Sequence, residues 1–578
     1  MKLRFVAFAA VLALILGAWF PHGTALAPTC TSNCYYFSSS LGNDSNNCTT
    51  TSTPCQTITK LNSITYPTGS TIALLGGDTF TITAALELNG PGASGQNVDG
   101  AITVTNYGSG SCNVLARVTA GCATIQVSGS LTQAIIGVNL ASCAFNNLRI
   151  LGGTTAALAL NIGNSASGGF YFDNHSGTNS GCTISNNEIV DFSVLFFMRT
   201  ASGQFNNMTF ENNYLHGSTI SATVDAGFLL QGATGGSNVI QGNRITNIGG
   251  HVDSVSGYYD GCCGNGILLS NGGANWTDQF NVTSNFGANT NSCGGPAGNW
   301  TYEASNVTMQ FDESYNGGPT SYTTGCDWDG FDIDGGSSYV TAQYLYSHGN
   351  YGPAFNWFQA NESGYTFQYN IYRYSISEND DTLQSGAVSI GGATNISTHG
   401  AIYNLTIYTA TVCLYFLDDS DIIFANNICW KTTGANEIVY SNVSAFHATM
   451  NGNNYYRTSG GSLTFKVPIT GTIVIGLAAW QAAISQEANS VSENPNLTSA
   501  GNGGTCYPGG VVPTGPQNNP VGCPGPYVLQ GGSPMIGIGI DLTQPPYSLN
   551  VGTRDYYGNT IPHGVGTGFN IGADGGNP

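Results

Sequence analysis

The chain has few charged residues and very few basic ones. Only 8% of its residues are charged, and 12 Lys and Arg stand against 32 Asp and Glu, which gives a net charge of −20. A surface that binds nucleic acid needs a basic stripe to neutralise the phosphates. The sequence therefore predicts no nucleic-acid partner.

Long hydrophobic runs are missing after the first twenty positions. Lys2 and Arg4 precede an almost wholly apolar stretch over 5–20, and the small residues of 25–27 follow it. This pattern is typical of a secretory signal peptide, here 1–27, rather than of a membrane anchor. No later stretch approaches the roughly 18 apolar residues that a spanning helix needs. We expect a secreted, extracellular chain with no membrane span after signal removal.

Short Cys-x-x-Cys pairs, which are typical of zinc sites, are also missing. All 16 cysteines follow position 27, and their number is even, which in an exported chain indicates disulfides. A metal site is the alternative for one group: Cys262, Cys263, Cys293 and Cys326. For the others the spacing favours local pairs: Cys30 with Cys34, Cys48 with Cys55, Cys112 with Cys122, Cys413 with Cys429, and Cys506 with Cys523.

What the chain does have is aromatic residues, at 11%, and 80 glycines, a mixture that favours a folded rather than a disordered chain. Its middle part carries a degenerate repeat of about 30 residues. Similar Asn-rich segments begin at 185, 211 and 241, and a second pair of similar segments begins at 307 and 340. Short strands that are broken by Gly and Asn at this period indicate a solenoid.

The strands are not separated by helical patterns, and the turn signals of hairpins are too sparse, so a coil of three short parallel strands fits best. We predict an all-β fold, a right-handed parallel β-helix, with outward Asn, Ser and Thr and with Asn in left-handed turns. A second strand column sets the register. It places Phe331, Ile333, Phe355, Trp357, Val388 and Ile390 inside, and Asp332, Asn356 and Ser389 outside.

Both ends of the mature chain resemble secreted right-handed β-helix proteins of the pectate-lyase-like superfamily. The segments that carry the resemblance are 35–45, 53–58 and 69–78 near the beginning, and 532–541, 554–559 and 570–574 near the end. The resemblance implies the fold and an activity on polysaccharides. We expect an N-terminal cap over 28–80, coils over 81–460, and a C-terminal capping segment over 461–578 with a short helix near 477–491.

The densest acidic cluster lies at 326–335 and holds Asp327, Asp329, Asp332 and Asp334. Residues two apart on a strand point to the same face, so Asp332 and Asp334 are expected to project side by side into solvent. They are candidates for acid and base catalysis and for metal ligation. Proximity of like charges is expected to raise one of their pKa values.

The segment 329–333 resembles an Asn-Thr-Asp-Gly-Phe-Asp-Ile stretch of polygalacturonases, and this resemblance implies a catalytic carboxylate at Asp329. Here Asp327 and Trp328 replace the Asn-Thr of that family. Its Asp-Asp pair about one coil later, its Gly-His-Gly and its Arg-Ile-Lys motifs are absent. The alternative is that these aspartates only form turns, since Asp-Gly is ordinary turn chemistry.

Five further residues complete the candidate site. His348 and Glu378 fall, with His216 and Tyr315, at equivalent positions after a strand, and His348 is the candidate general acid or base. The candidate substrate-binding residues are Trp328, which could stack on a sugar from its turn, Asn356, Glu378 and Arg373.

Three functions fit these residues. Hydrolysis of a polysaccharide needs two carboxylates and no cofactor, and carboxylates are abundant here. Elimination by a polysaccharide lyase needs a base, for which Arg373 is the nearest cation, and Ca²⁺ to bridge a polyanion. A glycan-binding or structural surface protein is the third. In each case we expect a monomer whose partner is a polysaccharide or other glycan.

Overall fold

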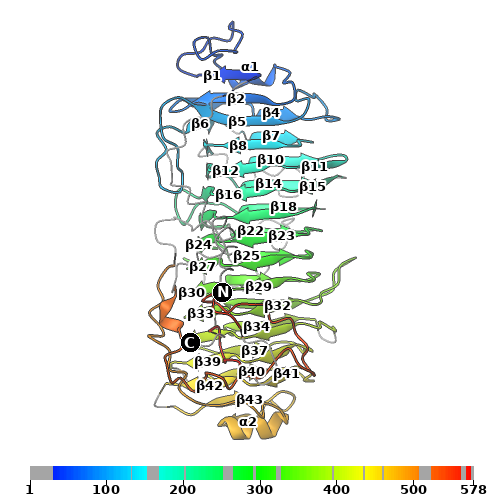
Figure 1. Cartoon of the computed structure of the whole chain (residues 1–578), viewed down its shortest axis with the longest axis vertical. Coiled ribbons are helices and arrows are strands. Elements are labelled where there is room, and N and C mark those ends of the chain that lie inside the picture. The colour runs from blue at the N-terminus through cyan, green and yellow to red at the C-terminus, as the bar shows by residue number, and fades with distance from the viewer. Residues whose placement is uncertain are drawn as a thin grey trace, which may run out of the picture.

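The computed structural model describes residues 30–574 except 31, 130, 132, 153–167, 201–202, 233, 251–263, 291–294, 321–326, 384, 394–395, 434–435, 459–460, 507–522 and 562–567. The expected signal peptide, 1–27, and the cysteines at 262, 263, 293 and 326 lie outside these residues. The described chain winds into stacked coils, each of which adds one strand to each of three long sheets (Figure 1).

Sheet 1 contains β1 (Cys34–Phe37), β2 (Ser70–Leu75), β5 (Ile102–Tyr107), β8 (Cys143–Asn146), β12 (Thr183–Ser185), β16 (Thr209–Glu211), β20 (Asn238–Gln241), β23 (Trp276–Gln279), β26 (Thr308–Gln310), β29 (Thr341–Gln343), β32 (Ile371–Arg373), β35 (Ala401–Tyr403), β38 (Ile423–Ala425) and β41 (Thr449–Asn451). Sheet 2 contains β3 (Thr79–Ile82), β6 (Ala123–Val127), β9 (Leu148–Leu151), β13 (Glu188–Val190), β17 (Tyr214–His216), β21 (Arg244–Ile248), β24 (Val282–Phe286), β27 (Glu313–Tyr315), β30 (Tyr346–His348), β33 (Ile376–Glu378), β36 (Thr406–Thr409), β39 (Ile428–Lys431) and β42 (Asn454–Arg457).

Sheet 3 contains β4 (Leu86–Asn89), β7 (Gln133–Val138), β10 (Gly168–Asn174), β14 (Val194–Thr200), β18 (Ala226–Gln231), β22 (Asn265–Ser270), β25 (Ala297–Tyr302), β28 (Asp329–Ile333), β31 (Phe355–Gln359), β34 (Val388–Gly392), β37 (Leu414–Phe416), β40 (Val439–Ser441), β43 (Thr464–Lys466) and β44 (Ile473–Ile475). A small sheet joins β11 (Thr178–Ser180), β15 (Gln204–Asn206) and β19 (Thr234–Gly235). Every pair in the long sheets is parallel except β43–β44. The predicted right-handed parallel β-helix is confirmed.

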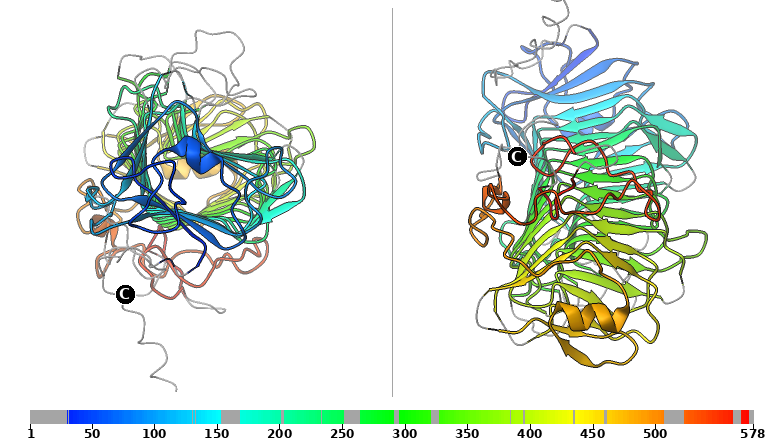
Figure 2. Two further views of the ribbon diagram at one scale, coloured as in Figure 1. Left: turned by 90° about the horizontal axis from the view of Figure 1, so that it is seen from above. Right: turned by 60° about the horizontal axis from the view of Figure 1, so that its bottom comes forward.

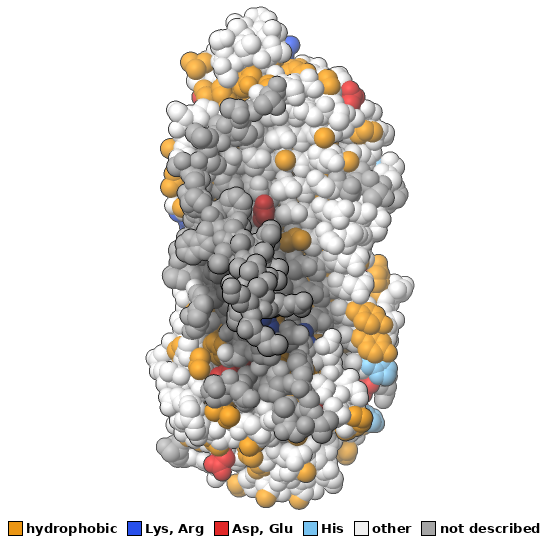
Figure 3. Space-filling view, viewed as in Figure 1, with side chains coloured by type: hydrophobic (Ala, Val, Ile, Leu, Met, Phe, Trp, Pro, Cys, Tyr) orange, Lys and Arg blue, Asp and Glu red, His pale blue; other side chains and the backbone are white. Residues whose placement is uncertain are grey.

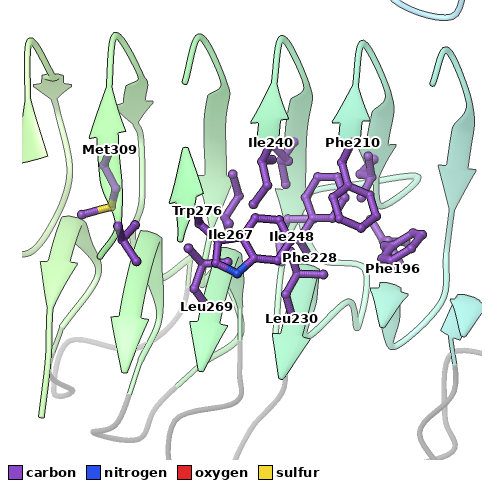
Figure 4. Close-up of a cluster of buried hydrophobic side chains, with 14 of the residues drawn as sticks. Phe196, Phe210, Phe228, Leu230, Ile240, Ile248, Ile267, Leu269, Trp276 and Met309 are labelled. Atoms are coloured by element: carbon purple, nitrogen blue, oxygen red, sulfur yellow. The ribbon is translucent and has the colours of Figure 1, made fainter. Parts of the chain in front are cut away.

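The predicted register is confirmed as well. Phe331 pairs with Phe355, and Phe355 pairs with Val388, as the second strand column requires. All six side chains that were expected inside are fully buried. Apolar residues from the three sheets fill the interior of the coils, where Phe196, Phe210 and Phe228 pack on one another (Figure 4).

Asparagine serves two purposes at the corners between sheets 1 and 2. Asn186 and Asn212 adopt left-handed backbone, as predicted. The asparagines that follow are not outward, as was expected, but buried. The backbone N–H of each donates to the side-chain oxygen of the next, from Asn187 through Asn213 and Asn243 to Asn281. These side chains satisfy backbone groups that the turn would otherwise leave unpaired inside the protein.

The two ends of the coil stack are covered differently. Helix α1 (Ile58–Asn62) lies at the N-terminal end, and α2 (Leu477–Ile484) lies at the other end (Figure 1). Helix α2 is shorter than the expected range of 477–491, because Ser485 adopts a left-handed conformation that ends it. The segment after α2, which includes a 3₁₀ turn at Gly525–Tyr527, runs back along the outside of the coils (Figure 2). Its apolar side chains pack on aromatic residues of the coils such as Phe311, Tyr344 and Tyr374.

Six disulfides lie within the described residues. Five are the local pairs that the spacing predicted, and the sixth joins Cys143 to Cys182. No helix in the described part of the chain is long and apolar enough to cross a membrane. Charged side chains are few and scattered on the face that Figure 3 shows.

Candidate active site

The acidic cluster lies on the outer face of sheet 3, on strand β28. Asp332 projects outward between the inward-facing Phe331 and Ile333, as the register predicted. It is not exposed, however, since only 5% of its surface is accessible. The expectation of a solvent-exposed Asp332 is wrong, because Trp300 on β25 and Asn356 on β31 flank it in the same column.

Asp329 is fully buried and shares this outer face. Its partner on β25, Ala297, belongs to the same outward apolar cluster as Trp300. The side-chain amide of Asn356 donates to Oδ2 of Asp329 across 2.9 Å. Strand pairing places that same Asn356 beside Asp332, so one amide stands between the two carboxyl groups.

Asp334 completes the cluster and is half-buried. The indole N–H of Trp300 donates to its Oδ2 at 3.1 Å, and the backbone N–H of Gly335 donates to its Oδ1. Burial raises the pKa of Asp334 to about 7, although these two donors favour the ionised form and oppose the shift.

Burial also raises the pKa values of Asp329 and Asp332 well above the ordinary range of aspartate. Neighbouring carboxylates add to the shift: Asp327 acts on Asp329, and Asp334 acts on Asp332. Among the described residues, the Oδ1 atoms of both Asp329 and Asp332 are buried without a hydrogen-bond partner. Burial and neighbouring like charge therefore both disfavour the ionised form of these two carboxyl groups.

A further carboxylate that the sequence did not assign lies near this cluster. Asp381 is fully buried and its charge raises the pKa of Asp329. Its oxygens accept from the backbone N–H groups of Ser385 and Gly386 and from the Thr411 hydroxyl. Burial raises the pKa of Asp381 to about 7. Asp381 lies in the turn before β34, just as Asp327 lies in the turn before β28. This equivalent position in the repeat is the signal that could have identified Asp381 from the sequence.

Trp328 lies in the turn before β28 with positive φ, as expected of a turn residue. Its indole is fully buried, and its N–H donates to the backbone oxygen of Gly287 at 2.9 Å. The ring also packs edge-on against Tyr351. The indole therefore offers no exposed face to a sugar.

The structure places His348 on sheet 2, whereas the acidic cluster is on sheet 3. Its Nε2 is hydrogen-bonded to Oε1 of Glu313 at 2.9 Å, and its ring stacks between Tyr315 and Tyr346. Glu378 follows it in the same column and accepts from the Tyr346 hydroxyl at 2.7 Å. The chain passes from β28 in sheet 3 through β29 in sheet 1 before it reaches β30 in sheet 2. Closeness in sequence therefore does not bring His348 to Asp332.

Arg373 lies on sheet 1 and is also apart from the cluster. Its guanidinium donates to Gln343, to the Tyr403 hydroxyl and to the backbone oxygen of Asn550 in the returning C-terminal segment. Of the predicted residues, the structure thus brings together Asp329, Asp332, Asp334 and Asn356. It does not bring His348, Glu378 or Arg373 to them.

Comparison with known proteins gives similarity at the level of architecture. No family model and no curated protein sequence matches the chain. A solved GH136 lacto-N-biosidase from Eubacterium ramulus is 14% identical, over 73% of this chain and 67% of that one, with a TM-score of 0.47. Pectate lyase Pel9A is 13% identical, over 96% and 98% of the two chains, with a TM-score of 0.41. The three parallel sheets themselves give the chain the architecture of a right-handed parallel β-helix.

Proposed function

We propose that this protein hydrolyses glycosidic bonds of a polysaccharide outside the cell, with carboxyl groups on the outer face of sheet 3 as acid and base. One observation carries the proposal. Buried Asp329 and Asp332 each have one oxygen without a partner among the described residues, and both have raised pKa values. They lie beside Asp334, whose two N–H donors favour its ionised form. Hydrolysis of a glycosidic bond needs one carboxyl group that donates a proton and one that accepts a proton. Carboxyl groups whose surroundings differ in this way suit these two roles.

The roles follow from the contacts. Asp332 has a raised pKa, and its Oδ1 has no hydrogen-bond partner among the described residues, so it is the candidate acid that protonates the leaving glycosidic oxygen. Asp334 is the candidate base, which takes a proton from the water that attacks the anomeric carbon. The water's hydroxyl then joins that carbon as the bond to the leaving oxygen breaks. The like charge of Asp329 raises the pKa of Asp332, and the amide of Asn356 limits that rise.

A purely structural role explains these aspartates poorly. Asn356 and Ser389 occupy the following positions of the same outward column, so the fold accepts neutral side chains there. Adjacent buried carboxyl groups cost stability, because each desolvates and repels the other's charged form. Clusters of groups with shifted pKa values are found preferentially at functional sites.

Elimination by a lyase is the less favoured activity, since the nearest predicted cation, Arg373, is bonded within sheet 1 and to Asn550. Ca²⁺ is the competing ligand for the unpartnered oxygens of Asp329 and Asp332, because it prefers carboxylate oxygen. A glycan-binding protein without catalysis is the third possibility to test.

The test is an assay on a panel of polysaccharides with product analysis by mass spectrometry, with and without EDTA. Products that have gained water, in equal amount after chelation, are expected. Asp332→Asn and Asp334→Asn should each lower turnover by at least about a hundredfold, the lower range for losing a general acid or base. Asp99→Asn, an exposed aspartate near the N-terminal end, is the matched control and should leave turnover unchanged. Unsaturated products, loss of activity with EDTA, or full activity of both variants would overturn the proposal.

A further inference from the structure

An apolar surface lies beside the carboxyl groups on the outer face of sheet 3. Phe358 on β31 and Leu417, directly after β37, keep 43% and 45% of their surfaces exposed. Both lean over Gly391 on β34. A Cβ added there would lie 3.3 Å from Leu417 and 3.9 Å from Phe358. We call Phe358 and Leu417 over Gly391 the apolar platform.

The apolar platform continues the column of Asp334. Phe358 follows Asn356 by two residues, just as Asp334 follows Asp332, and Asn356 pairs with Asp332. Phe358 pairs in turn with Gly391. Because neighbouring strands lie about 4.8 Å apart, the platform begins one strand from the carboxyl groups and ends about 14 Å from them.

A pair of tyrosines extends this surface along the neighbouring column. Asn356, Ser389, Tyr415 and Tyr440 follow one another on successive strands. The rings of Tyr415 and Tyr440 stack with centroids 4.6 Å apart. The ammonium group of Lys466 donates to the Tyr440 hydroxyl at 2.7 Å and lies over that ring. The result is an apolar surface with a rim of hydroxyl and amide groups.

We propose that the apolar platform binds the sugar rings of an uncharged glycan chain that extends from the carboxyl groups toward the C-terminal end of the coils. This inference rests on the proposed hydrolytic function and names its substrate class. Carbon-bound hydrogens of a pyranose ring pack on apolar and aromatic side chains, while its hydroxyls bond to a polar rim. The small residue Gly391 lets Phe358 and Leu417 form one continuous surface for such packing.

The negative charge of the protein favours an uncharged glycan over a polyuronate as the ligand. The proposed glycan path begins at Asp329, Asp332 and Asp334 and runs over the apolar platform. The protein as a whole carries a net charge of −20. The cation on the path, Lys466, already bonds to Tyr440 and Asn442 at its far end. A uronate that reached the carboxyl groups would meet the like charge of the Asp334 carboxylate in surroundings of low dielectric constant.

The test measures binding by calorimetry in the Asp332→Asn protein, which prevents turnover during the measurement. The probes are uncharged oligosaccharides built of glucose, xylose, galactose, mannose or N-acetylhexosamine, and oligogalacturonate as the charged counterpart. At least one uncharged probe is expected to bind, and oligogalacturonate at least about tenfold more weakly. Phe358→Ala with Leu417→Ala should lower the affinity for the uncharged probe at least about tenfold, the effect of losing one or two ring contacts.

Tyr339→Ala with Tyr369→Ala is the matched control. These exposed tyrosines also stack on each other, with centroids 5.1 Å apart, but lie in the turns that precede sheet 1. The control pair should leave the affinity unchanged, and Phe358→Tyr, which keeps the ring, should retain it. Unchanged affinity in the platform variant, an equal loss in the control, a preference for oligogalacturonate, or no binding of any uncharged probe would each overturn the inference. Binding that depends on the platform in a protein that cleaves no glycan would instead contradict only the proposed hydrolysis.

Discussion

The side-chain amide of Asn356 donates a 2.9 Å hydrogen bond to Oδ2 of Asp329, which joins strand β31 to the acidic cluster of β28. The bond lowers the pKa of Asp329 against the large upward effect of burial. The same amide lowers the pKa of Asp332, which lies beside it in the column. Asn356 therefore limits how strongly two buried carboxyl groups hold their protons.

Replacing this amide should change the pH dependence of activity. In Asn356→Leu both carboxyl groups lose a donor that favours their ionised forms, so their pKa values rise further. We expect the profile of kcat/KM to move to higher pH, and the rate at neutral pH to fall about tenfold or more, since a hydrogen bond to a charged group contributes about 1.5–3 kcal/mol. Asn47→Leu, at an exposed asparagine near the N-terminal end that does not have left-handed backbone, is the control. An unmoved profile would contradict this positioning role.

The acidic limb of the same profile should report Asp334. Its pKa is raised to about 7, so it is ionised and can act as a base only near and above neutral pH. Activity should therefore fall as the pH drops through about 7, because the base becomes protonated. The profile of kcat/KM in the wild-type protein checks this. A limb near pH 4, the ordinary value for aspartate, would show that Asp334 is not the base.

A third prediction concerns stability rather than activity. Asp312 follows Asn281 in the buried asparagine ladder, where its Oδ1 accepts the backbone N–H of Asn281 at 2.6 Å. Burial, with the nearby Asp278, raises its pKa well above the ordinary value, and Oδ2 has no hydrogen-bond partner among the described residues. The folded chain thus binds more protons than the unfolded chain above about pH 4, so stability is lost as the pH rises through neutrality.

Asp312→Asn should remove that loss. The new amide keeps the acceptor oxygen and can donate to the backbone oxygen of Asp278, as Asn281 donates to that of Ile240. We expect a higher melting temperature at pH 8 and little change at pH 4, with a gain of about 1–3 kcal/mol for removing an unsatisfied buried group. The converse variant, Asn243→Asp, should be destabilised most at high pH. Equal effects at both pH values would refute the titration.

The disulfide Cys143–Cys182 should contribute more to stability than the other five bridges within the described residues. It closes a loop of 39 residues and joins two successive coils, whereas Cys30–Cys34 spans only four positions. By the chain-entropy model the longer loop constrains the unfolded chain more, and removal costs about 2–4 kcal/mol. Thermal melts of Cys143→Ala with Cys182→Ala, compared with Cys30→Ala with Cys34→Ala, check this. Equal melting temperatures would be the contrary result.

The sequence alone predicted the strand columns and which side of each strand faces inward. Alternation of Phe331, Asp332 and Ile333 fixes their directions, because a slip by one residue would expose Phe331 and bury a charge in the core. The repeat of about 30 residues aligned Phe331 with Phe355 and Val388, and the structure pairs them so. The placement of Asp332, Asp334 and Asn356 on one face also followed from this alternation, whereas alternation alone would have placed Asp329, three residues before Asp332, on the opposite face.

Two properties depend on the tertiary structure and cannot be read from a strand column. They are which side chains cover a residue, and which sheet a residue nearby in the sequence belongs to. Asp332 was expected in solvent but is buried, since flanking strands and their side chains determine accessibility. His348 lies one corner away on sheet 2, because each coil turns between sheets after only a few residues. The C-terminal segment buries Arg373 through contacts 177 residues apart in the chain. Periodicity determines direction within a strand, whereas burial and pKa depend on segments that meet only in the folded protein.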